Sequence, residues 1–177
     1  SKQAQPYARP DIREALGHMI ADDQAARGAI SEARTDEEMA AAKRRVADID
    51  RKNLPIIKSI FKEVGFPDLA MVGRDGVSTA FLIVQHADDD PAFQQHALEL
   101  ATPLMEQRQL SKQQYAMLSD RVRLASGKPQ LYGTQIEKVD GTMRPRAVED
   151  PDNLDARRKR MAMGPIKDYL DSFQKDP

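Results

Sequence analysis

The sequence contains no cysteine and no tryptophan, and aromatic residues make up only 5% of its 177 positions. The absence of cysteine excludes disulfide bonds, thiolate metal sites and cysteine nucleophiles. With so few aromatic side chains, the hydrophobic core must be built from Leu, Ile, Val, Ala and the eight methionines.

The chain also has no excess of charge and no long apolar run. Its 27 basic and 28 acidic side chains leave a net charge of −1, which lacks the basic footprint of a nucleic-acid-binding protein. No stretch reaches the roughly 18 consecutive apolar residues of a membrane span. The expected partner is therefore a small molecule or another protein, and the composition does not fix the oligomeric state.

What the sequence does contain is typical of a folded, mainly α-helical protein. Hydrophobic residues make up 40% and charged residues 31%, as in ordinary globular chains. The length suits one compact domain. We expect a flexible tail over residues 1–10 and a single helical domain over 11–175, a bundle of about six or seven helices with one small β-hairpin.

Local signals indicate where most of these helices begin. Thr35 with Glu38 and Ser111 with Gln114 have the spacing of capping boxes, and Asp90 stands before a proline at a first helical position. The predicted helices cover 10–30, 35–52, 77–87, 90–104, 111–126, 150–161 and 165–173.

Two stretches between these helices are ambiguous. Pro55 either kinks the second helix or starts a new one that runs to Val64, and residues 65–76 read as a loop rich in Gly, Pro and Asp. The run 77–87 is short and apolar nearly all round, so a buried strand competes with a buried helix. Ser78 or Thr79 would cap that helix.

Asp140-Gly141 is the strongest hairpin signal in the chain. It predicts a strand within 130–138 and a return strand within 142–148, limited by Pro145.

His86 is the main candidate for chemistry. It ends the buried 77–87 run and precedes the aspartates of residues 88–90. A histidine there, oriented by Asp88, would suit a general acid or base. The alternative is a helix C-cap histidine bonded to carbonyls and to the following turn.

A metal site would need His86 and Asp88 to converge with His96 or Glu99. His96 falls with Phe93 and Leu100 on what reads as an apolar face, which favours a buried structural histidine. The sequence has neither an HExxH nor a repeated ExxH motif, so we expect no metal and no other cofactor.

Further polar residues have structural and functional interpretations. Asp23 and Arg27 stand one helical turn apart and are expected to pair, and Arg121 has the fork geometry for a carboxylate. Residues 73–76 are a weak candidate for anion binding on backbone N–H groups. Residues 132–135 would line a polar pocket or form a bulged edge strand around Gly133.

A series of short motifs follows one another along the chain. They are Met19 with Asp23-Gln24 and Arg27, Asn53-Leu54, Gly65-Phe66-Pro67, Val72-Gly73, Gln85-His86-Ala87-Asp88, Asp90-Pro91-Ala92-Phe93-Gln94, Asp120-Arg121, Gly127-Lys128-Pro129-Gln130, Tyr132-Gly133-Thr134-Gln135, Glu149-Asp150-Pro151 and Arg157-Arg158. Taken together, these motifs resemble an uncharacterised bacterial family, a domain of unknown function, over roughly residues 11–172. One departure is Phe66, where family members usually carry Trp.

The resemblance implies no reaction, but it suggests that the polar motifs belong to one site. His86 and Asp88 would be catalytic, and the substrate would be held by Gln85, Arg121, Tyr132 and Gln135. The first hypothesis is a small metal-independent acid–base enzyme, hydrolase-like, that uses His86. The alternative is a non-catalytic, exported protein-binding or interaction module. Exported relatives and the start at Ser1 favour a periplasmic or secreted protein over a cytoplasmic one.

Overall fold

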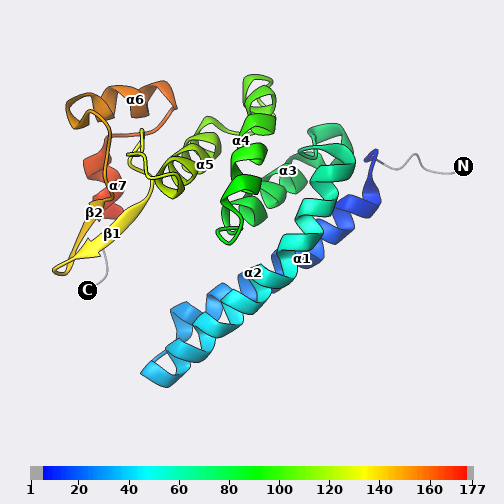
Figure 1. Cartoon of the computed structure of the whole chain (residues 1–177), viewed down its shortest axis with the longest axis horizontal. Coiled ribbons are helices and arrows are strands. Elements are labelled where there is room, and N and C mark those ends of the chain that lie inside the picture. Colours follow the sequence, from blue (N-terminus) through cyan, green and yellow to red (C-terminus); the bar gives the residue numbers. More distant parts are fainter. Residues whose placement is uncertain (1–5, 175–177) are drawn as a thin grey trace, which may run out of the picture. The chain divides into compact units, whose positions relative to one another are not determined.

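The computed structural model describes residues 6–174, and these residues form seven α-helices, one short 3-10 helix and a two-stranded sheet (Figure 1). The predicted mainly helical architecture with one hairpin is therefore confirmed. The elements are α1 Pro10–Glu32, α2 Asp36–Val64, α3 Leu69–Gln85, α4 Pro91–Glu106, α5 Lys112–Ala125, β1 Ile136–Val139, β2 Thr142–Pro145, η1 Pro151–Asn153, α6 Leu154–Arg160 and α7 Ile166–Ser172.

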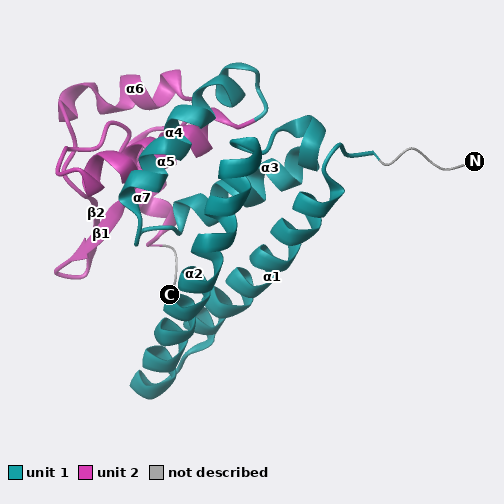
Figure 2. Cartoon of the chain, turned by 45° about the vertical axis from the view of Figure 1, so that its right-hand side comes forward, with its two compact units in different colours: residues 1–109 teal, residues 110–177 magenta. Residues whose placement is uncertain are grey.

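The chain divides into two compact units, residues 1–109 and 110–177 (Figure 2). The first contains α1 to α4, and the second contains the hairpin and the remaining helices. The single domain expected over 11–175 stays a prediction. Of the expected flexible tail, residues 1–5 lie outside the described residues, whereas the backbone N–H groups of Ala8 and Arg9 bond to carbonyls of α3. Within 6–174, no helix combines the length and apolar character that a membrane crossing needs.

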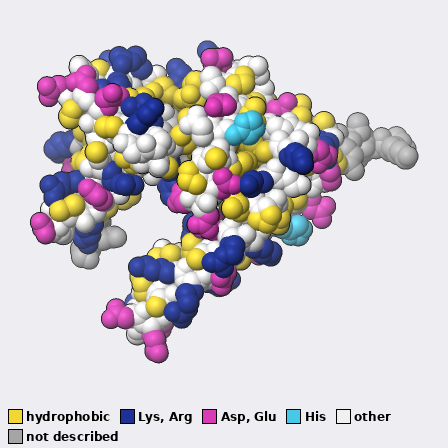
Figure 3. Space-filling model, viewed as in Figure 1, with side chains coloured by type: hydrophobic (Ala, Val, Ile, Leu, Met, Phe, Trp, Pro, Cys, Tyr) yellow, Lys and Arg dark blue, Asp and Glu magenta, His cyan; other side chains and the backbone are white. Residues whose placement is uncertain are grey.

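In the first unit, α1 and α2 pack as an antiparallel helical hairpin (Figure 1). The α2 start has the predicted capping box, with Thr35 and Glu38 bonded reciprocally. Pro55 lies inside α2, which continues as one helix to Val64. Acidic and basic side chains lie next to one another over the end of the hairpin where α1 connects to α2 (Figure 3). This end therefore presents a mixed, solvated surface.

The loop predicted over 65–76 is confirmed for residues 65–68 and wrong beyond them, because α3 already begins at Leu69. Asp68 caps it by accepting a hydrogen bond from the Met71 N–H, so Ser78 and Thr79 lie inside the helix and do not start it. Of the glycines that suggested a loop, Gly73 has a different structural role. Gly73 adopts φ 79° and ψ 170° and interrupts the helix with a kink. The run 77–87 is helical through Gln85, which excludes the competing strand interpretation.

The prediction that His96 is buried is also wrong, because this side chain lies on the exposed face of α4. The buried stripe of α4 is displaced from the expected one, and the polar residue within it is Gln94. The Gln94 amide donates to the Val84 carbonyl at the end of α3, so it satisfies that backbone group. The stripe consists of Phe93, Gln94, Ala97, Ala101 and Leu104.

In the second unit, the sequence signals for α5 and for the hairpin are confirmed. Ser111 and Gln114 form the predicted capping box. Val139 pairs with Thr142 across the turn, and Asp140 and Gly141 both have positive φ, as a two-residue hairpin turn requires. The strands are shorter than predicted, since residues 130–135 form a folded loop instead of extending β1.

The helix predicted over 150–161 begins later than expected, because Asp150 does not cap it. Asp150 adopts a left-handed conformation with φ 44°, and its side chain makes no capping bond to η1. Its carboxylate accepts a hydrogen bond from the Asn153 side chain instead. The α-helix therefore begins later, at Leu154.

Candidate functional site

A buried aspartate on α1 is bonded to the histidine that ends α3. Asp23 lies on the buried face of α1 with its side chain fully enclosed, and His86 occupies the C-cap position of α3, as the sequence predicted. Asp23 Oδ1 lies 2.8 Å from His86 Nδ1. A carboxylate at this nitrogen fixes the orientation of the ring and favours a proton on Nδ1.

The Asp23 carboxylate has further partners that keep it charged. Arg27 Nη1 donates to Oδ1 at 2.9 Å, which confirms the predicted i, i+4 pair, and Gln24 Nε2 donates to Oδ2 at 3.0 Å. Burial by itself raises the pKa of Asp23. The hydrogen bond and charge of His86, with the charge of Arg27, outweigh burial, so the Asp23 pKa lies below its usual value.

Arg27 also joins Asp23 to a second carboxylate, on α2. Its Nη1 and Nη2 donate to the two oxygens of Asp50 at 3.1 and 3.0 Å. Asp23, Asp50 and His86 offer ligand atoms within 4.8 Å of one another, which is close enough for one metal ion. The Arg27 guanidinium offsets one of the two carboxylate charges and already donates to both groups, so the donor set suits a metal-free ion network better than a cation site.

His86 borders an open pocket with a volume of about 190 Å³. Acidic side chains gather on its wall, since Asp50, Asp88 and Asp89 line it together with Lys43. Among residues 6–174, no hydrogen-bond partner is found for His86 Nε2. The ring is thus held at one nitrogen by Asp23, while its other nitrogen is available for proton exchange.

The structure places the two residues predicted to act beside His86, Asp88 and Gln85, in different surroundings. Asp88, expected to orient the ring, lines the same pocket, and its Oδ1 accepts a hydrogen bond from the Gln94 side chain. Asp23 is the carboxylate that bonds the ring. Gln85 is buried at the end of α3. The roles of Asp88 in catalysis and of Gln85 in substrate binding stay predictions.

The other predicted substrate-binding residues, Arg121, Tyr132 and Gln135, belong to the second unit, where Arg121 and Gln135 bond each other. Arg121 Nη1 donates to Gln135 Oε1 at 2.9 Å. The Gln130 side chain clamps the Gln135 backbone, donating to its carbonyl and accepting from its N–H. Burial raises the pKa of Tyr132, and the Asp120 charge raises it further. Their role as substrate-binding residues stays a prediction.

Asp120 organises the loop that carries Tyr132 and Gln135. Its side chain is fully buried and accepts hydrogen bonds from the backbone N–H groups of Leu131, Tyr132 and Thr134 and from the Thr134 hydroxyl, at 2.7 to 3.0 Å. A carboxylate that accepts four hydrogen bonds can hold an irregular loop in one conformation. Gly133 permits the tight turn at its centre, with φ 68°.

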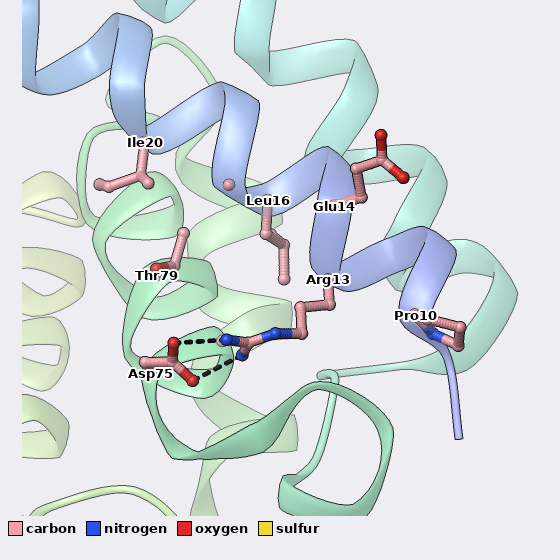
Figure 4. Close-up of a pocket in the computed structure, with 9 residues that line it drawn as sticks. Pro10, Arg13, Glu14, Leu16, Ile20, Asp75 and Thr79 are labelled. Carbon is pink, nitrogen blue, oxygen red and sulfur yellow. Dashed lines mark hydrogen bonds and ion pairs between the residues drawn. The ribbon is translucent and has the colours of Figure 1, made fainter. Parts of the chain in front are cut away.

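A different pocket, of about 400 Å³, lies between α1 and α3 (Figure 4). Arg13 reaches across it and binds both oxygens of Asp75, at 2.6 and 2.8 Å. The Arg13 guanidinium also lies 4.3 Å from the centre of the Tyr7 ring. The charges are paired within the protein, and a carboxylate stands where residues 73–76 were considered for anion binding. The ion pair of Arg13 with Asp75 therefore stabilises the kink at Gly73.

Sequence reasoning missed Asp23 and Asp50 as site residues, although a signal was present. Asp23 continues the apolar stripe of Ile12, Leu16 and Met19 at helical spacing, and a charged residue on such a stripe is buried beside its neighbours. Buried charges need partners. The identity of that partner, His86, depends on how α1 and α3 pack.

The chain is thus a mainly helical protein with a buried Asp–His pair in one unit and an aspartate-centred loop in the other. It belongs to the Family of unknown function (DUF6624), whose model matches residues 10–176. Comparisons with curated proteins and with solved structures gave no significant match.

Proposed function

We propose that the protein is a small acid–base enzyme, hydrolase-like, in which Asp23 and His86 form the catalytic pair. The observation that carries the proposal is the buried Asp23 carboxylate at His86 Nδ1, with the His86 side chain lining an open pocket. In such a pair the carboxylate fixes the tautomer and stabilises the imidazolium that forms when the histidine accepts a proton.

The lining of the pocket determines the form that the reaction would take. Among residues 6–174, those that line it include no hydroxyl or thiol side chain, so we assign the role of nucleophile to a water molecule. His86 Nε2 removes a proton from this water as the oxygen attacks the substrate, and it returns the proton to the leaving group. Asp23 remains ionised throughout, because its pKa is held low. Asp50, Asp88 and Asp89 favour substrates that carry a positive group.

The test is a screen of ester, amide and phosphate-ester substrates with three matched proteins. Wild type should turn over at least one class, and His86→Gln should lower kcat/KM by roughly 10²- to 10⁴-fold, the usual contribution of a general base. His96→Gln is the control, because His96 is exposed on α4. Equal rates for wild type and His86→Gln, or no turnover of any class, would count against catalysis.

The alternative function, a binding or interaction module, has its own support in the second unit. Several polar motif residues there bond backbone groups. Besides Asp120 and Gln130, Arg157 donates to the carbonyls of Leu131 and Glu149. Such bonds hold loops in shape without chemistry. Under this alternative the unit is a rigid platform for a partner, and His86→Gln would change neither binding nor loop order.

A further inference from the structure

The second unit contains a buried arginine without an acidic partner. Arg158 on α6 is 3% exposed. Its Nε donates to the Gly164 carbonyl and its Nη1 to the Tyr132 carbonyl, both at 2.7 Å. No carboxylate of residues 6–174 lies within ion-pair distance of it. Burying a guanidinium without a counter-charge is costly, and burial lowers its pKa.

The neighbouring arginine shows that this arrangement is not a general property of α6. Arg157 also donates to backbone carbonyls, but the Asp150 carboxylate lies 3.9 Å from its Nη1. The bonds of Arg158 occupy Nε and one hydrogen on Nη1. Since a guanidinium has five N–H groups in a planar fork, donors remain for a further acceptor.

Arg158 lines a pocket of about 430 Å³, within the range of small-molecule sites. Its apolar wall includes Met117, Met163 and Pro165. The Tyr169 ring lies 5.1 Å from the Arg158 guanidinium, and the Tyr169 hydroxyl donates to the Thr134 carbonyl. The wall is therefore built by packed side chains, and the buried Arg158 is one of the lining residues.

We propose that this pocket binds a small monocarboxylate with an apolar body, and that Arg158 anchors its carboxylate. One planar guanidinium matches one carboxylate in two parallel hydrogen bonds. The flexible methionines accommodate an aliphatic or aromatic body. The exposed Asp168, which also lines the pocket, opposes binding by repulsion and so selects for ligands with a single charge. This inference is independent of the proposed catalysis by His86.

The test is an NMR titration of the full chain with octanoate, using octanamide and inorganic phosphate as comparison probes. Octanoate should shift the backbone amides of Thr134 and Gly164 saturably. Octanamide should bind at least tenfold more weakly, because it lacks the charge. Equal binding of octanamide, or stronger binding of phosphate, would overturn the assignment of an apolar monocarboxylate.

Substitutions locate the anchor and separate binding from folding. Arg158→Lys should weaken octanoate binding by about tenfold or more, since an ammonium cannot form the bidentate pair. Arg160→Lys, on the exposed side of the same helix, should change nothing. Asp168→Asn should tighten binding by roughly two- to fivefold, the effect of one exposed charge.

Met163→Trp should fill the pocket and abolish binding while leaving Arg158 in place. It distinguishes loss of the site from loss of the fold, which the amide spectrum reports directly. Unchanged affinity in folded Arg158→Lys, or weaker binding in Asp168→Asn, would refute the proposed anchor.

Discussion

Asp23 Oδ1 and His86 Nδ1 lie 2.8 Å apart although 63 positions separate the two residues in the sequence. Packing of α1 against α3 brings them together, since Asp23 faces inward from the middle of α1 and His86 ends α3. The bond thus ties a helix end to a helix middle. It holds one ring nitrogen of His86, whereas no partner is found for the other among residues 6–174.

The first prediction concerns the protonation of the His86 ring. In the neutral form we expect the proton on Nδ1, because Nδ1 must donate to the ionised Asp23. Nitrogen-15 correlation spectra of labelled protein at alkaline pH should show a protonated Nδ1 and a bare Nε2. Exposed His18 and His96 serve as internal references and should favour the Nε2–H form. A bare Nδ1 in His86 would contradict the proposed pair.

The second prediction concerns stability in acid. The pKa of Asp23 is lowered in the folded protein, so its stabilising contribution is fully present above the unfolded value of about 3.9 and is lost as pH falls through the folded value. Asp23→Asn should therefore destabilise the protein near pH 7, by about 1–3 kcal/mol, and by progressively less in acid. Urea denaturation across pH measures this difference. Asp48→Asn, at an exposed ion pair, should give nearly the wild-type curve.

The third prediction concerns the loop around Asp120. Asp120→Ala leaves three backbone N–H groups and a hydroxyl without their acceptor, so we expect a loss of at least about 3 kcal/mol in the free energy of unfolding. Hydrogen exchange should accelerate at the amides of Leu131, Tyr132 and Thr134 before the rest of the second unit. Asp152→Ala, at an exposed position, is the control. Unchanged protection of these amides would mean that Asp120 does not hold the loop.

The fourth prediction compares two glycines. Gly73→Ala should destabilise the protein by about 1–3 kcal/mol, because φ 79° is unfavourable for any residue with a Cβ. The new Cβ would also lie 2.7 Å from Tyr7 Cε1. Gly28→Ala should instead stabilise it by up to about 1 kcal/mol, since Gly28 is helical with open space beside it. Thermal melts of both variants check the difference, and equal effects would argue against the kink.

The fifth prediction tests whether Arg27 excludes metal from the Asp23 cluster. Arg27→Gln removes the positive charge that is bonded to both Asp23 and Asp50, so it should raise the affinity for Zn²⁺ by roughly tenfold or more, ~1.4 kcal/mol. Calorimetric titration of wild type and variant measures the change. Arg51→Gln, at an exposed pair on α2, should leave zinc affinity unchanged. Tight zinc binding by wild type would indicate a metal site instead of an ion network.

Structural features that depend on only a few neighbouring residues could be predicted from the sequence. The caps at Thr35 and Ser111, the turn at Asp140-Gly141 and the pair of Asp23 with Arg27 all follow from contacts over four residues or fewer. Helix geometry and turn chemistry fix such contacts before any tertiary packing occurs. The position of His86 at a helix end is of this kind as well.

The sequence by itself therefore determined the helical class, most of the helix starts and the hairpin turn. Only the tertiary structure decided that Asp23 bonds His86 and that Arg27 bonds Asp50. It also decided that Asp120 accepts hydrogen bonds from the loop of residues 131–134, and that Arg158 is buried without a carboxylate partner. These outcomes depend on which helix faces pack together. Burying a charge costs free energy unless the charge is paired, so a buried charged residue needs a partner. Helix packing decides which side chains are close enough to be that partner.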